Sequence, residues 1–78
     1  MRKTYYEIME PINENIEFFK YERDYALNKM EQVLKSATLH EETKNEIADE
    51  WLKIANKMDE DLAYYYSIKE EVNASYCE

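Results

Sequence analysis

Apolar residues recur through the first 37 positions at alternating spacings of three and four residues, the repeat of an amphipathic helix. Arg23 takes the one seam position that is not apolar. Thr4, followed three residues later by Glu7, forms a capping box. The pattern predicts a helix over about residues 4–36 that packs along one seam against another helix. The apolar members of the seam are Tyr5, Met9, Ile12, Ile16, Phe19, Ala26, Met30, Val33 and Ala37.

Pro11 is the one residue that opposes a continuous first helix, because proline lacks the backbone N–H that an interior position donates. It either kinks the helix or starts it, with residues 4–10 as a separate short turn. The apolar repeat passes through Pro11 in phase, which favours a kinked but continuous helix.

A second apolar repeat follows Thr38 and Glu41, which form a second capping box. It predicts a helix over about residues 39–75, joined to the first by two to four residues. Asp61 takes the one polar position of this seam. The seam consists of Ile47, Trp51, Ile54, Met58, Tyr65, Ile68 and Val72, flanked by Ala48, Ala55, Leu62 and Tyr76.

These two repeats predict an all-α fold, in which two long antiparallel helices form a helical hairpin as a single domain over residues 1–78. Such a hairpin buries one stripe per helix, and a small core of this kind supplies little stability. Several apolar residues also lie outside both seams. We therefore expect a homodimer that forms a four-helix bundle. These outlying residues include Phe18, Tyr21, Tyr25, Leu27, Leu34, Leu52 and Tyr66.

Composition excludes several classes of function. The 78 residues contain no Gly, one Pro, one Cys and one His. Without Gly the chain has no glycine-rich phosphate loop, and one Cys with one His cannot build a zinc site. The content of 45% hydrophobic and 14% aromatic residues argues against a disordered chain.

The residue types that carry catalysis are nearly absent. His40 falls in the predicted turn, where we interpret it as a capping or solvated residue. Cys77 lies beside acidic Glu78, which favours an inert free thiol in a reducing, cytoplasmic compartment. The Glu-x-x-His repeats of di-metal bundles do not occur. The sequence therefore predicts no enzyme, no cofactor and no metal.

Phe18, Tyr21 and Tyr25 form a stripe that we place on the side of the first helix away from the second. Tyrosine supplies large contact area at low entropic cost and is enriched at protein interfaces. The stripe is one candidate surface for binding a partner protein. The alternative is that these residues belong to the core and lie at its solvent-exposed border.

The second half of the chain is the acidic element. Residues 1–36 carry six basic and seven acidic residues, a net of −1, whereas residues 37–78 carry four and eleven, a net of −7. Such a charge argues against direct binding to nucleic acid or to an anionic membrane. Glu42, Glu46, Asp49 and Glu50 share one helix face.

This acidic helix face has two interpretations. Side chains at i and i+4 lie about 6 Å apart, close to the phosphate spacing of nucleic acid. The face could therefore imitate a phosphate backbone and occupy a basic groove on another protein. The alternative is a solvated face that keeps a small protein soluble.

The function predicted from these patterns is a small acidic non-enzymatic protein-interaction module, an inhibitor or adaptor of a larger partner. One alternative is a purely structural, self-assembling helical bundle. Another is a binder of a small molecule or nucleotide between protomers, with Arg23 as its best support. An arginine in a seam needs a partner, either a carboxylate of a neighbouring chain or a ligand phosphate.

Overall fold

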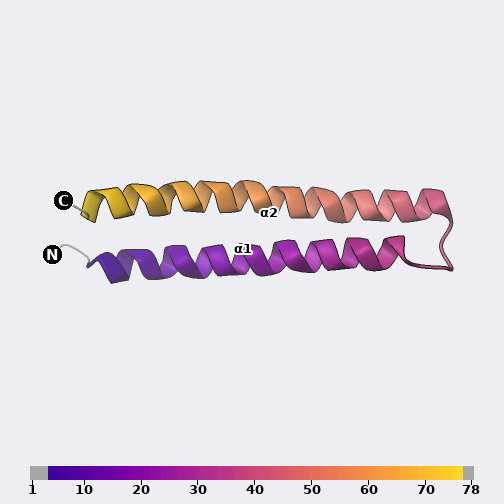
Figure 1. The fold of residues 1–78 in the computed structure, drawn as a ribbon, viewed down its shortest axis with the longest axis horizontal. Coiled ribbons are helices and arrows are strands. Elements are labelled where there is room, and N and C mark those ends of the chain that lie inside the picture. Colours follow the sequence, from indigo (N-terminus) through magenta and orange to yellow (C-terminus); the bar gives the residue numbers. More distant parts are fainter. Residues whose placement is uncertain (1–3, 77–78) are drawn as a thin grey trace.

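The computed structural model describes residues 4–76 and contains two long helices joined by a short linker. Helix α1 spans Tyr5–Leu34 and helix α2 spans Glu41–Tyr76. The helices run antiparallel and side by side, so the first and last described residues lie at the same end (Figure 1). The hairpin is 59 Å long and only 16 and 14 Å across. The prediction of an all-α helical hairpin is confirmed for the described residues.

The start of α1 follows the predicted cap. The hydroxyl of Thr4 accepts a hydrogen bond from the backbone N–H of Glu7 at 3.2 Å, which satisfies one of the free donors of the first turn. Pro11 lies inside the helix on its exposed side, so α1 is continuous through it. The carbonyl of Glu7 loses its helical donor at Pro11, but the exposure of both residues leaves that carbonyl within reach of water.

The linker between the helices has six residues rather than two to four. The Thr38 hydroxyl lies 3.2 Å from the Ser36 hydroxyl, and the Thr38 backbone N–H also donates to the Ser36 hydroxyl. The backbone N–H of Lys44 donates to the carbonyl of His40 at 2.9 Å, and α2 begins at Glu41. The predicted cap at Thr38 is therefore wrong, because local turn bonds engage its hydroxyl outside the helix.

The core is a single narrow layer between the helices. In α1 the buried side chains are four members of the predicted seam. In α2 the buried positions are those that we expected beside the seam, whereas Ile54, expected inside it, is 41% exposed. The seam of α2 is thus shifted by a fraction of a turn from the prediction, toward Ala48, Ala55 and Leu62. The other predicted members stay partly buried, namely Ile47, Trp51, Met58, Tyr65, Ile68 and Val72. The buried side chains are Met9, Ile12, Ile16, Ala26, Ala48, Ala55 and Leu62.

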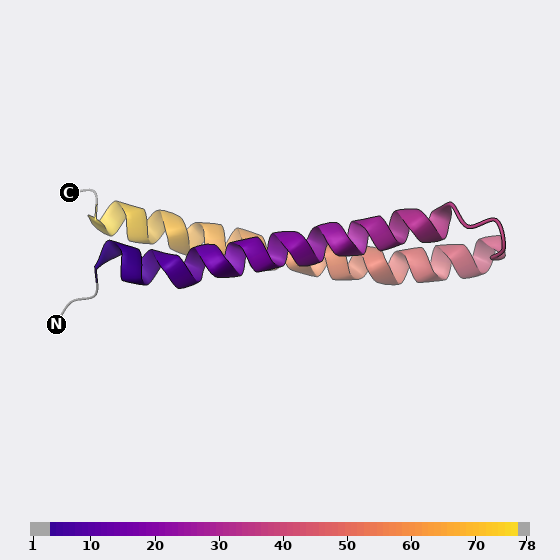
Figure 2. The ribbon, with the colours of Figure 1, turned by 90° about the horizontal axis from the view of Figure 1, so that it is seen from below.

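The two halves of this core are built differently. Toward the chain ends, Met9, Ile12, Ile16 and Leu62 form one cluster, with larger side chains packed around it. Toward the linker, the buried positions are alanines, which let two helix backbones approach closely. Figure 2 shows that the helices cross each other along their length. Neither helix, as far as residues 4–76 are described, is long and apolar enough to span a membrane.

Candidate functional site

Four aromatic rings form a continuous chain across one flank of the hairpin. Phe18 and Phe19 of α1 meet edge to face with ring centres 5.5 Å apart, and Phe19 lies 5.5 Å from Tyr65 of α2. Tyr65 in turn meets the neighbouring ring of Tyr64 edge to face, again at 5.5 Å. The inner two rings are partly buried in the seam, whereas Phe18 is 56% and Tyr64 63% exposed. A surface of both helices is therefore tied together by ring contacts.

A second aromatic contact joins the helices nearer the linker. The ring of Tyr25 meets Trp51 of α2 edge to face at 6.0 Å, and the Lys29 ammonium lies 5.4 Å from the Tyr25 ring centre. Because Tyr25 lies seven residues after Phe18, both project from the same side of α1. The two groups of rings form one surface, which we call the aromatic face. It consists of Phe18, Phe19, Tyr25, Trp51, Tyr64 and Tyr65.

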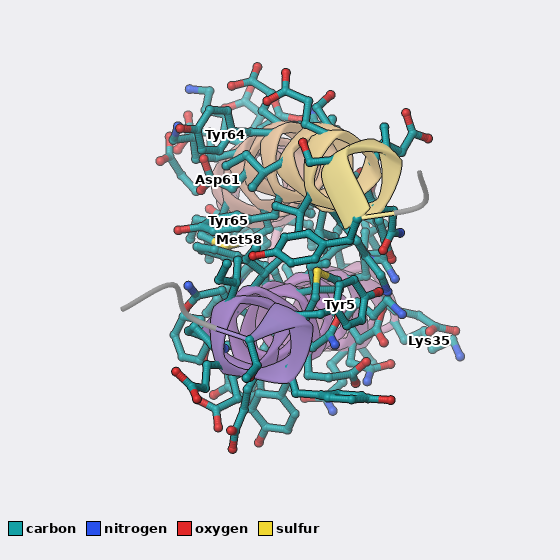
Figure 3. All side chains as sticks on the ribbon, turned by 90° about the vertical axis from the view of Figure 1, so that its left-hand side faces the viewer. Tyr5, Lys35, Met58, Asp61, Tyr64 and Tyr65 are labelled. Atoms are coloured by element: carbon teal, nitrogen blue, oxygen red, sulfur yellow. The ribbon has the colours of Figure 1, made fainter. Side chains whose placement is uncertain are left out.

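Figure 3, a view along the hairpin, shows how this face sits. Tyr64, Tyr65 and Asp61 lie on one side of the helix pair, at the left of the view, and Tyr5 lies toward the opposite side. Asp61, expected in the seam, is instead half-buried at its edge, where it accepts from Lys57 at 3.1 Å. The hydrogen bond that the Lys57 ammonium donates to Asp61 raises the pKa of Lys57.

The structure corrects the predicted stripe on α1. Tyr25 does not lie away from α2, since its ring contacts Trp51. Phe18 is 56% exposed and contacts Phe19 of its own helix, and it is Phe19 that contacts Tyr65 of α2. Tyr21 alone points outward, 67% exposed and without a ring contact among the described residues. The expectation failed because residues 18 and 25 follow the edge of the seam, whereas residue 21 is turned by a further 60°.

Tyr64 belongs to the aromatic face, but it was not singled out from the sequence as a surface residue. The signal was present in the run Tyr64–Tyr65–Tyr66. Consecutive helical residues are 100° apart, so three in a row cannot share one buried seam. Tyr65 takes the seam, and the other two are exposed on opposite sides of it.

The predicted acidic face occupies the outer side of α2. Glu42, Glu46, Asp49 and Glu50 are all exposed, as expected. Glu50 pairs with Lys53 at 3.3 Å. Among the described residues, the other three make no ion pair. Their charge is thus directed to solvent, with no ion pair from residues 4–76 to neutralise it.

Arg23 finds its partners inside its own chain. Its guanidinium lies 3.3 Å from Asp59 of α2 and 3.2 Å from Asp24 of α1. The hydrogen bond to Asp59, followed by that to Asp24, raises the pKa of Arg23. The seam arginine therefore requires neither a neighbouring chain nor a ligand phosphate, and the small-molecule alternative loses its best support.

The remaining candidates for chemistry lie apart from one another. His40 is exposed in the linker, where its carbonyl accepts the first backbone bond of α2. Cys77 lies outside the described residues. Within residues 4–76, no three His, Cys, Asp or Glu side chains are grouped so that they could hold a metal ion.

Comparison with known proteins adds no assignment. No protein-family model, no curated protein and no solved structure matches this chain.

Proposed function

We propose that the chain is a non-enzymatic protein-interaction module that works as a homodimer. In this proposal the aromatic face packs against a second copy to form a four-helix bundle. The acidic face of α2, most of which stays outside the bundle, binds a basic groove of a larger protein and inhibits or adapts it. The observation that carries the proposal is the aromatic face, a chain of rings that crosses both helices with its ends exposed.

The surface area of the chain supports a second copy. A globular monomer of 9.5 kDa exposes roughly 5,000 Å² by the usual scaling with mass. This hairpin exposes 6238 Å². The excess of about 1,200 Å² exceeds the ~800 Å² that each partner contributes to a standard interface. Burying one face in a dimer would therefore lower the exposed area of each chain to the value usual for a globular protein of this mass.

The shape of the hairpin favours the same arrangement. One flank of a molecule 59 Å by 16 Å offers a long strip along both helices. Buried aromatic side chains dominate interface energetics, and the exposed rings of Phe18, Tyr25 and Tyr64 are available on that strip. Two such strips packed together make a four-helix bundle with aromatic rings at its centre.

Most of the acidic face stays outside this dimer, since Glu42 and Asp49 lie on the outer side of α2. Glu50 lies fourteen residues before Tyr64 and so shares its side of the helix, where it would lie at the rim of the dimer. Glu42, Glu46 and Asp49, the carboxylates without an ion pair in the described residues, follow helical spacings of three and four residues. Their charges lie about 5–6 Å apart, a spacing that a groove built for phosphates can accept. The same charge disfavours nucleic acid and anionic membranes as direct partners. We place this function in the cytoplasm.

The dimer is tested by solution mass, measured by light scattering at micromolar protein. Replacing Phe18 and Tyr64 by Ala should convert the dimer to a monomer, because these two rings are the exposed ends of the series of four ring contacts. Tyr21→Ala is the matched control, since Tyr21 is equally exposed but outside the aromatic face. A wild-type monomer would contradict the dimer, and the aromatic face would then be the contact surface for the partner itself.

The acidic face is tested by charge reversal. The chain is immobilised, and bound cell proteins are eluted with duplex DNA. Glu42→Lys, Glu46→Lys and Asp49→Lys together should abolish capture of the eluted protein. The control reverses Glu60, Glu70 and Glu71, which are also exposed on α2 and change the net charge equally. Equal losses in both triple variants would show that general charge, and not this face, is responsible.

A further inference from the structure

A shallow groove with a volume of about 690 Å³ runs along α1 near the chain ends. Tyr5 and Tyr6 line one end, buried Met9 lies at its base, and Glu10 and Glu14 follow along the helix. Lys69 closes it from the side of α2. Its volume falls in the range of known ligand sites, and its lining combines apolar rings with a few charges.

The groove and the aromatic face lie on opposite flanks of the hairpin. Tyr6, Asn13 and Lys20 are spaced by seven residues and so share one side of α1. The Lys20 ammonium lies 6.0 Å from the ring centre of Tyr66, the neighbour of Tyr65 that turns away from the ring chain. A second copy on the aromatic face would leave the groove open.

The aromatic end of the groove is held in place. Tyr5 meets Tyr76 edge to face at 5.6 Å, and its hydroxyl donates to the side-chain oxygen of Asn73. Tyr6 rests edge to face against Tyr5 at 5.5 Å and is 80% exposed. The Tyr6 ring thus contacts the ring of Tyr5, which is itself tied to α2, while most of the Tyr6 surface faces solvent.

The rest of the groove carries a surplus of negative charge. Glu10 and Glu14 are exposed one turn apart and make no ion pair among the described residues. Glu17, farther along, lies 3.7 Å from Lys20. Lys69 is the single cation that the described residues place in the lining. The charge of the groove is complementary to a cation, and an exposed aromatic ring also attracts one.

We propose that this groove binds an extended, arginine-bearing peptide segment of a partner protein. A guanidinium stacks on the Tyr6 ring and hydrogen-bonds to Glu10, and arginine suits such a site because its planar fork stacks on rings and matches carboxylates. The lining from Tyr5 to Glu17 spans roughly 18 Å, the length of five or six extended residues. Glu10 and Glu14 are about 6 Å apart, close to the distance between alternate side chains of an extended peptide. The segment therefore carries the pattern Arg-x-Arg.

This inference goes beyond the proposed function, since it uses neither the aromatic face nor the acidic face. The probe is a fluorescent hexapeptide, Gly-Arg-Ser-Arg-Ser-Gly, and the readout is fluorescence anisotropy with the full chain. A peptide with citrulline in place of both arginines is the ligand control, because citrulline keeps the shape and loses the charge. The arginine peptide should bind at least about tenfold more tightly, and the backbone amide signals of Tyr6 and Glu10 should shift in NMR spectra.

Two matched variants separate this site from general attraction. Glu10→Gln with Glu14→Gln should weaken binding about tenfold, whereas Glu42→Gln with Glu46→Gln, the same spacing on α2, should change it less than twofold. Tyr6→Leu should weaken binding, and Tyr21→Leu should not. All six positions are exposed, so circular dichroism should confirm an unchanged fold. Equal losses in both double variants, equal binding of the citrulline peptide, or no binding would each overturn the proposal.

Discussion

The guanidinium of Arg23 on α1 bonds the carboxylate of Asp59 on α2 at 3.3 Å, and it is the one ion pair that joins the two helices in the described part of the chain. The Arg23 side chain is 31% and the Asp59 side chain 56% exposed, so water competes for both charges. Such pairs contribute between 0 and about 1 kcal/mol. The pair thus gives the seam arginine a charged partner but contributes little to the free energy of unfolding.

Arg23→Met should therefore not lower the free energy of unfolding, and should raise it by up to about 1 kcal/mol, because the methionine adds apolar contact in the seam. In this variant the Asp59 carboxylate remains exposed to water, so the loss of its partner leaves no buried, unpaired charge. Urea unfolding followed by circular dichroism measures the change, with Lys53→Met on the exposed side of α2 as control. A loss above about 1 kcal/mol would show that the pair specifies the helix arrangement.

Close approach of the helices near the linker depends on small side chains. Ala26 is fully buried, and Ala48 and Ala55 are also buried in this half of the core. Ala26→Leu should cost about 1–3 kcal/mol, because added methylenes have no space there. The exposed neighbour Asn28→Leu is the control, and urea unfolding is the measurement. An unchanged midpoint for Ala26→Leu would mean that the backbones are farther apart than the structure shows.

Pro11 lies inside α1 on an exposed surface, where it packs against no core cluster. Pro11→Ala restores the backbone donor to the carbonyl of Glu7 and should stabilise the chain by about 1–3 kcal/mol. Thermal unfolding should show a higher Tm, whereas Asn13→Ala, two residues later, should change it less. A lower Tm for Pro11→Ala would indicate that the proline shapes the helix in a way that the core requires.

The two threonines predicted as caps should respond differently. Thr4 accepts the Glu7 N–H at the start of α1, so Thr4→Ala should cost about 1 kcal/mol. Thr38 caps no helix and contacts Ser36 in the exposed linker, so Thr38→Ala should cost clearly less. Hydrogen exchange of the first turn of each helix reports the effect locally. Equal fraying of α2 after Thr38→Ala would contradict the observed linker.

Glu31, at the end of α1, makes a pH-dependent contribution to the free energy of unfolding. The Lys35 ammonium lies 2.8 Å from its carboxylate and lowers the pKa of Glu31. A lowered folded-state pKa means that the stabilisation is present above the unfolded pKa of Glu31 and is lost as pH falls through the folded one. An NMR titration should give a higher Glu31 pKa in Lys35→Gln than in the parent chain. Identical titration curves would show that the pair does not persist in solution.

Most of the fold was predictable because helical periodicity is a local property of the chain. The seam of α1, the Thr4 cap and the hairpin itself follow from residue spacing and agree with the structure. The site was predicted less well. The exposure of Glu42, Glu46, Asp49 and Glu50 was correct, because charged residues opposite a seam stay in water. The grouping of aromatic residues into one face was not predicted, because it depends on how the two helices pack against each other.

The sequence alone determined that there are two helices, roughly where each begins and ends, and which side of α1 is buried. Only the tertiary structure decided that Ala48 and Ala55, rather than Ile47 and Ile54, face the core. The two sets follow the same seven-residue spacing, and they differ by a small turn of α2 about its own axis, because Trp51, Met58 and Tyr65 stay partly buried as predicted. Small side chains allow the closer contact between backbones, and the way the two helices pack sets Tyr65 against Phe19 and Trp51 against Tyr25.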